Sequence, residues 1–137
     1  MTLFVDTSVW FAAANIRDGR NAHAKLLLSE ADNLLLTDHV LIESWRLLNS
    51  RVHRLAAENF WQGIRSGIAT FEKVNVTDLE TAWAIGEAFS DQAFSIVDRT
   101  SFAVMERLGI TRVATFDHHF AIYRFGRHRD RAFELVR

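Results

Sequence analysis

Short apolar runs alternate with segments of helical periodicity along most of this chain, and no other feature restricts its fold as strongly. Strands joined by crossover helices pair in parallel. Strands are expected at 3–5, 34–36, 70–76, 112–115 and 132–136, with 70–76 at a sheet edge because of its charges. Helices are expected at 7–15, 21–31, 38–51, 53–66, 78–88 and 95–108. The pattern predicts an α/β fold with a short, mainly parallel central sheet.

Residues 1–137 are expected to form a single domain. The sequence has no repeat, no serine-rich linker and no proline. A chain of 137 residues that is 49% hydrophobic buries about two-thirds of its extended surface, which suffices for one core. Cysteine is absent, so disulfides and thiolate metal sites are excluded.

Nothing in the sequence indicates a membrane or secreted protein. No stretch approaches the ~18 uncharged apolar residues that a membrane span needs. The N-terminal apolar run lacks a basic leader and is split by Asp6, which argues against a signal peptide. We therefore expect a cytoplasmic protein. Its net charge of −1 argues against nucleic-acid binding through bulk charge alone.

Four acidic residues lie inside or at the end of apolar sequence, namely Asp6, Glu43, Asp98 and Asp117. Desolvating a carboxylate costs several kcal/mol unless a partner compensates it. Asp6 and Asp117 end predicted parallel strands, at the sheet edge where open α/β sheets bind ligands. Glu43 and Asp98 share a helix face with apolar neighbours, so both point toward the protein body. We expect all four to converge on a shared cation.

Such a cluster favours a hard divalent ion. At an effective dielectric of about 20, two carboxylates about 4 Å apart repel by ~4 kcal/mol. Mg²⁺ takes oxygen ligands and is commonly completed by substrate phosphates. An ion held in this way polarises a phosphoryl oxygen and lowers the pKa of a bound water, which leads to phosphodiester hydrolysis. Supporting hydroxyls are available from Thr7, Ser8, Ser101 and Thr115.

Each acid also has an ordinary structural alternative. Glu43 can pair with the arginine three residues later in its helix. Asp98 follows Ser95 by three residues, as in a capping box. The two acids at strand ends can cap the helices that follow. Convergence of the four is favoured over all of these alternatives acting together.

Four segments in order carry a family pattern: LFVDTSVW at 3–10, the isolated Glu43, SIVDRTSF at 95–102 and ATFD at 114–117. With these segments the chain resembles the PIN-domain nucleases over essentially its whole length, and more narrowly the VapC-type toxins of bacterial toxin–antitoxin modules. The resemblance implies a three-layer α/β/α domain with a Mg²⁺- or Mn²⁺-dependent ribonuclease site.

The resemblance also implies roles for individual residues. Asp6, Glu43, Asp98 and Asp117 would be the catalytic acids, and Asp6 and Asp98 would ligate the metal. The implied reaction is endonucleolytic hydrolysis of RNA phosphodiesters by a metal-activated water. Toxin members of the family usually form homodimers. A VapB-type antitoxin holds them inactive, often by placing a basic side chain in the acidic pocket.

Several further residues are candidates for substrate or metal contacts. Trp10 and Phe11 follow Asp6 closely and are the best candidates for a wall of the site, where Trp10 would contact RNA bases. Arg99 either binds phosphate or balances the acids. His118 and His119 offer additional ligands, although paired histidines at a strand–helix junction are more often surface residues.

Two further features have more than one interpretation. Asp91 follows Glu87 at i, i+4 spacing, and this pair lies either on a solvated edge or at the mouth of the active site. The arginines at 124, 127, 129, 131 and 137 form either a solvated face or a phosphate-binding one.

Other functions use a similar acidic sheet edge. An aspartate-based phosphatase or phosphotransferase usually carries a second aspartate two residues after the first, but that position here is Ser8. A receiver-like regulator needs a lysine at the end of a late strand, and the only lysines are Lys25 and Lys73. A catalytically silent PIN scaffold that acts through protein contacts remains a third alternative.

Overall fold

A computed structural model describes all residues from Met1 to Arg137. Five parallel strands form one sheet in the order β3-β2-β1-β4-β5. They are β1 (Thr2–Val5), β2 (Asn33–Thr37), β3 (Thr70–Glu72), β4 (Arg112–Ala114) and β5 (Glu134–Val136). The predicted parallel sheet is confirmed, and β3 lies at its edge as its charges indicated.

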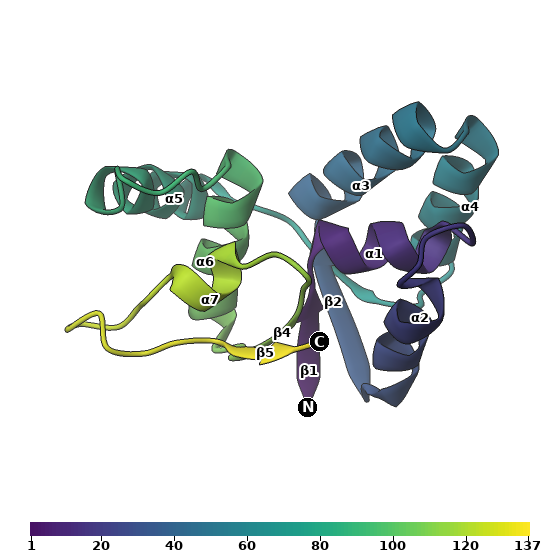
Figure 1. Ribbon diagram of the computed structural model, residues 1–137. Coiled ribbons are helices and arrows are strands. Elements are labelled where there is room, and N and C mark those ends of the chain that lie inside the picture. The colour runs from purple at the N-terminus through teal and green to yellow at the C-terminus, as the bar shows by residue number, and fades with distance from the viewer.

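Helices cover both faces of this sheet. They are α1 (Thr7–Ala14), α2 (Asn21–Glu30), α3 (Asp38–Arg51), α4 (Arg54–Arg65), α5 (Val76–Ala88), α6 (Ile96–Leu108) and α7 (His119–Ile122). Figure 1 shows α5, α6 and α7 on one side of the strands and α1, α2 and α4 on the other, with α3 extending from the top of the sheet. The expected three-layer α/β/α arrangement is confirmed. None of these helices combines the length and the hydropathy that a membrane span requires.

The central strand β1 is buried from Leu3 to Val5. Phe4 and Val5 of β1 have no exposed surface, and neither have Val113 and Ala114 of β4. The register pairs Phe4 with Val113 and Val5 with Ala114, so both strands end at the same level. An apolar run with both faces covered is what a parallel strand between helix layers requires. The residues that follow these two strands therefore emerge side by side.

Local signals set most helix ends. Asn75 and Ser95 begin α5 and α6 with complete capping boxes, in which the third helical residues are Asp78 and Asp98. Gly109 ends α6 with a φ of 69°, which glycine adopts without strain. The short helix α7 was not predicted, because its four residues are too few to show a helical period.

One ion pair joins α5, α6 and the sheet edge. Arg107 donates from Nε and Nη2 to the two carboxylate oxygens of Asp78, both at 2.9 Å, and from Nη2 to Glu72 at 3.2 Å. The side chain of Asp78 is only 2% exposed, whereas that of Arg107 is 31% exposed. Loss of the guanidinium would leave a buried carboxylate without its charged partner.

Arg107→Leu is therefore expected to lower the free energy of unfolding by about 2 kcal/mol, since water reaches part of the pair. Urea denaturation at neutral pH measures the change. The control is Arg54→Leu, which removes an exposed pair with Glu58 and should cost less than about 1 kcal/mol. Equal losses in the two variants would show that the Arg107 pair does not stabilise this corner of the fold.

Candidate active site

A cavity of about 480 Å³ lies above the carboxyl ends of β1 and β4. The chain leaves β1 toward β2 on one side, while β4 lies on the other, so this is the point where the strand order reverses. Open α/β sheets bind ligands at such a point. Five carboxylates line the cavity, from Asp6, Asp18, Glu43, Asp98 and Asp117, together with the guanidiniums of Arg20 and Arg51. All four predicted acids therefore lie around one space.

Asp6 is the most deeply buried of these acids, with 5% of its surface exposed. Its backbone N–H donates to Ala114 at 3.0 Å and so extends the ladder between β1 and β4 by one residue. Ser8 and Thr115 each donate a hydroxyl to its Oδ2 at 2.9 Å. Burial, helped by the charge of the nearby Asp98, raises the pKa of Asp6 to about 6, although these two hydrogen bonds oppose the shift.

Asp98 is fixed in the first turn of α6. Its Oδ2 accepts the Ser95 N–H at 3.0 Å, and its own N–H donates to Ser95 Oγ at 3.0 Å. His119 Nδ1 lies 2.8 Å from the same oxygen. The capping box considered as an alternative therefore exists, and it holds Asp98 at the cavity. Capping and a role in the site are compatible, because a carboxylate has two oxygens.

Asp117 and Glu43 complete the acidic lining. Asp117 Oδ1 accepts the His119 N–H at 2.9 Å, and His119 Nδ1 lies 3.5 Å from it. His119 thus lies between two of the acids. Glu43 enters from α3, which packs against α6. Burial raises the pKa of Glu43, and the charges of Asp98 and Asp117 raise it further.

The predicted supporting hydroxyls fall into two groups. Thr115 Oγ1 donates to Asp6 and accepts the Asp117 N–H at 2.9 Å, so it couples these two acids. Ser8 Oγ donates to Asp6 and accepts the Phe116 N–H at 3.0 Å. Thr7 lines the cavity, and its buried hydroxyl lies near Glu43, where it opposes the rise in the pKa of that carboxyl. Ser101 is fully buried in α6, without a hydrogen-bond partner, and does not line the cavity.

The donor set fits a hard divalent cation. Ser8 and Thr115 on Asp6, and Ser95 and His119 on Asp98, all contact the Oδ2 atom, and Oδ1 of each carboxylate takes part in none of these hydrogen bonds. Oxygen donors on separate, immobilised side chains are what Mg²⁺ or Mn²⁺ takes in proteins. Asp117, His118 and His119 form a second group of side chains that could bind a metal ion. One ligand atom from each lies within 4.8 Å of the other two.

Two predicted substrate contacts do not lie at the cavity. Trp10 is 2% exposed and packs against Phe60 with ring centroids 5.6 Å apart, because the face of α1 that carries it meets α4. A role in contacting RNA bases is therefore wrong for Trp10, whereas Phe11 does line the cavity. Arg99 points along α5, where it donates to Ala82 at 3.4 Å, so it neither lines the cavity nor pairs with the acids.

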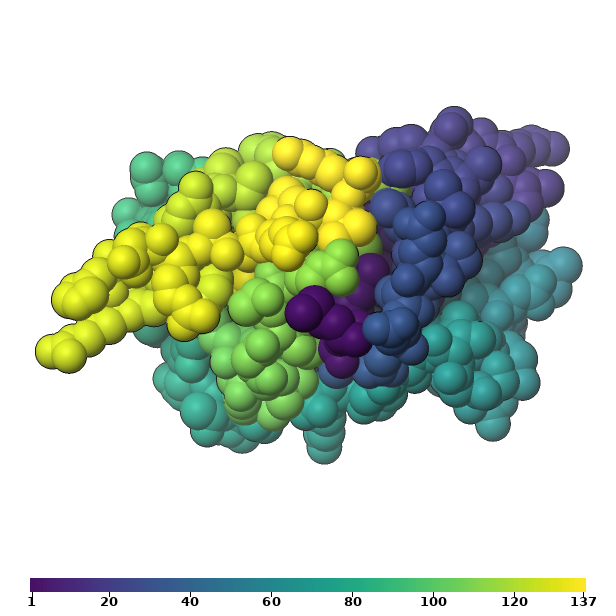
Figure 2. All heavy atoms as spheres, turned by 90° about the horizontal axis from the view of Figure 1, so that it is seen from below, coloured from purple at the N-terminus to yellow at the C-terminus, as the bar shows by residue number.

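The residues with open interpretations lie elsewhere. Asp91 is exposed in the turn after α5 and does not line the cavity. The arginines at 124, 127, 129 and 131 belong to the segment between α7 and β5, which projects from the body (Figure 2), whereas Arg137 directly follows β5. Arg124 donates to three carbonyls at the end of α7, while Arg129 and Arg131 stack over Phe89 and Phe125. Arg124 and Arg131 therefore stabilise the segment itself, and Arg129 attaches it to the end of α5.

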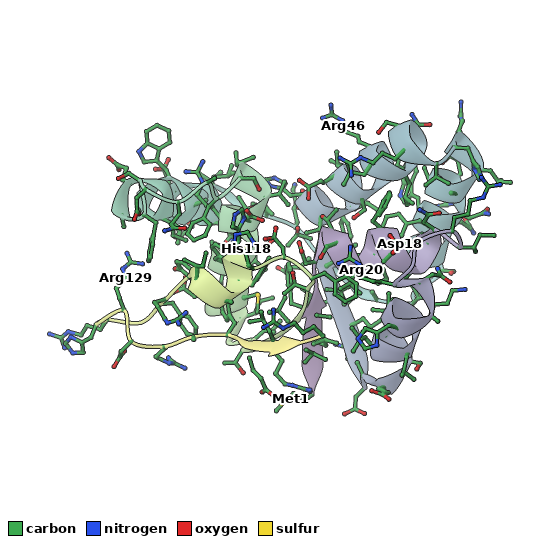
Figure 3. The ribbon with its side chains drawn as sticks, in the orientation of Figure 1. Met1, Asp18, Arg20, Arg46, His118 and Arg129 are labelled. Atoms are coloured by element: carbon green, nitrogen blue, oxygen red, sulfur yellow. The ribbon has the colours of Figure 1, made fainter.

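Sequence reasoning missed two basic residues at the cavity. Arg20 stacks over Phe116 with its guanidinium carbon 4.3 Å from the ring centre. Its Nε atom lies 3.9 Å from Oδ1 of Asp18. Figure 3 shows Arg20 and Asp18 on the α1 side of the sheet, far from Arg129 on the projecting segment. Arg51 ends α3. Both arginines sit in ordinary polar sequence, so no pattern distinguished them from a solvated surface.

Comparisons with known proteins agree with this fold. The PIN domain model matches residues 3–126. The 23S rRNA-specific endonuclease VapC20 of Mycobacterium tuberculosis, from strains CDC 1551 / Oshkosh and ATCC 25618 / H37Rv, is 38% identical over 120 residues, which cover 87% of this chain and 92% of the relative. A crystal structure of the M. tuberculosis VapC20, described as a sarcin–ricin loop cleaving toxin, aligns with a TM-score of 0.82 at 37% identity and the same coverage. The chain therefore belongs to the PIN-domain family and is a VapC-type member of it.

Proposed function

We propose that this chain is a metal-dependent endoribonuclease and the toxin of a toxin–antitoxin pair. The observation that carries the proposal is the meeting of Asp6, Glu43, Asp98 and Asp117, from four separate segments, at one cavity above the switch point of the sheet. Asp6 and Asp98 are buried and neither forms an ion pair with an arginine, which favours a bound metal. The relatedness to an rRNA-specific endonuclease supports RNA as the substrate.

Asp6 and Asp98 would hold Mg²⁺ or Mn²⁺ through their Oδ1 atoms, and Glu43 and Asp117 would complete the acidic shell. When bound, the ion supplies Lewis-acid polarisation of the phosphate and a more acidic water. Ser8 and Thr115 fix the orientation of Asp6 by hydrogen bonds, and His119 does so for Asp98. The raised pKa of Glu43 suits a base that accepts the proton lost by the attacking water.

The substrate and partners follow from the same relatedness. Because VapC20 is described as cleaving the sarcin–ricin loop, that loop of 23S rRNA is the first target to test. A VapB-type antitoxin with a basic side chain would fit the acidic cavity, and exposed apolar residues on α3 to α5, such as Ile42, Trp61 and Trp83, would suit a homodimer or an antitoxin contact.

Incubation of the purified protein with ribosomes or total RNA in Mg²⁺, followed by end mapping, tests the activity. Cleavage at defined sites, abolished by EDTA, is expected. Intact RNA under all conditions would favour the silent PIN scaffold instead. Release of inorganic phosphate from small monoesters, without RNA cleavage, would favour the aspartate-based phosphatase or phosphotransferase.

Metal binding makes a separate prediction. Mg²⁺ or Mn²⁺ should raise the melting temperature of wild type by several degrees, since a ligand that binds only the folded state stabilises it. Asp6→Asn should show a smaller shift, because one ligand is lost. Differential scanning fluorimetry over a metal titration measures both proteins. Equal shifts would mean that the ion binds elsewhere, for example at Asp117, His118 and His119.

A further inference from the structure

A second hollow adjoins the acidic cavity. It is a groove of about 700 Å³ between the α1–α2 connection and the α3–α4 junction. Its polar lining consists of Asn15, Arg17, Arg51, His53 and Asn59, with no carboxylate among them. Arg51 lines both the groove and the acidic cavity, so the two spaces adjoin at its side chain. A strongly acidic site thus lies next to a cationic one.

The two guanidiniums of this groove are unpaired. The side chains of Arg17 and Arg51 appear in none of the ion pairs and none of the hydrogen bonds of the protein. Other nearby arginines differ: Arg20 pairs with Asp18, and Arg54 pairs with Glu58. Arginine without an internal partner is free to make bidentate contacts to phosphate.

His53 adds a directed donor. Its Nδ1 accepts the Ala56 N–H at 3.0 Å, as the cap of α4. In the neutral ring this hydrogen bond places the proton on Nε2, which can then donate to a ligand. The charged groups of the groove, Arg17 and Arg51, are donors only, and His53 adds a third donor. A ligand rich in acceptor oxygens and negative charge is the complement.

We propose that this Arg17–Arg51 groove binds the phosphates of the RNA strand on one side of the cleaved bond. The proposal rests on the proposed function, since it extends the path of the same substrate. A strand with one phosphate in the acidic cavity carries its neighbouring phosphates past Arg51. The carboxylates repel those phosphates, and the groove compensates this repulsion while setting which bond reaches the acids.

Direct binding tests the groove independently of catalysis. A fluorescently labelled single-stranded RNA of 12 nucleotides is titrated with wild type, Arg17→Ala and Arg51→Ala in EDTA, at several salt concentrations. Each variant should bind several-fold more weakly. The slope of log affinity against log salt should fall by about 0.7 for each arginine removed, the value for one phosphate contact to a single strand.

Two matched controls use arginines outside the groove. Arg54→Ala removes the neighbouring paired arginine, and Arg127→Ala removes an exposed arginine of the projecting C-terminal segment. Both should keep wild-type affinity and salt slope. Circular dichroism and melting temperature establish that all four variants are folded.

The outcomes separate the two proposals. Unchanged RNA affinity in Arg17→Ala and Arg51→Ala, equal losses in the controls, or no RNA binding by wild type would overturn the groove. An acidic partner protein would then be the remaining candidate ligand for this cationic groove. If wild type cleaves RNA but the groove variants bind RNA as tightly as wild type, the nuclease proposal holds and the groove proposal fails. If the groove variants bind RNA more weakly but wild type does not cleave it, the groove proposal holds and the nuclease proposal fails.

Discussion

Asp6→Asn and Asp98→Asn are each expected to lower the rate of RNA cleavage by more than about 100-fold while the protein stays folded. Loss of a group that only orients a metal ligand already costs 10–100-fold, and these two residues would be ligands themselves. Asparagine can still accept the Ser8 and Thr115 hydroxyls through its carbonyl oxygen. What it lacks is the negative charge that holds the cation.

Cleavage of a defined RNA in Mg²⁺, followed by gel electrophoresis, measures the loss, and circular dichroism establishes the fold. Asp130→Asn, which removes an exposed carboxylate on the projecting segment, serves as the matched control and should cleave like wild type. Substantial cleavage by purified Asp6→Asn or Asp98→Asn would refute a mechanism based on this pair of acids.

The fold was predictable because its signals are local and repeated. The strands around Phe4 and Val113 are apolar on both faces, and Ser95 and Gly109 mark the two ends of α6. The short helix α7 and the start of β5 were harder to predict from the sequence, because three or four residues show too little periodicity. Packing of α7 against α6 and pairing of β5 with β4 supply what the local sequence lacks.

The acids of the site were predictable for a different reason. A carboxylate such as Asp6 is costly in apolar sequence, so its position carries information. Surface arginines carry no such cost, and Arg20 and Arg51 could not be distinguished from Arg54 or Arg65. Trp10 was misplaced because sequence adjacency to Asp6 does not say which way a side chain leaves its helix: it meets Phe60, whereas Phe11 reaches the cavity.

Without metal, wild type is expected to lose stability as the pH rises from about 4 to 6. The pKa of Asp6 is about 6 in the folded protein, against 3.8 without burial. The folded state therefore holds this proton more tightly than the unfolded chain, and the resulting stabilisation disappears as the pH passes through the folded pKa. One pKa unit corresponds to ~1.36 kcal/mol, so the full effect is about 3 kcal/mol.

Asp6→Asn isolates this contribution, because asparagine does not titrate. Urea denaturation of both proteins in EDTA across this pH window should show the difference, wild type minus variant, becoming less favourable by about 3 kcal/mol. At pH 7 without metal the inactive variant should then be the more stable protein, and added Mg²⁺ should reverse that order. A difference that stays flat with pH would mean that burial of the Asp6 carboxylate is not costly, and the main reason for a cation at this position would be lost.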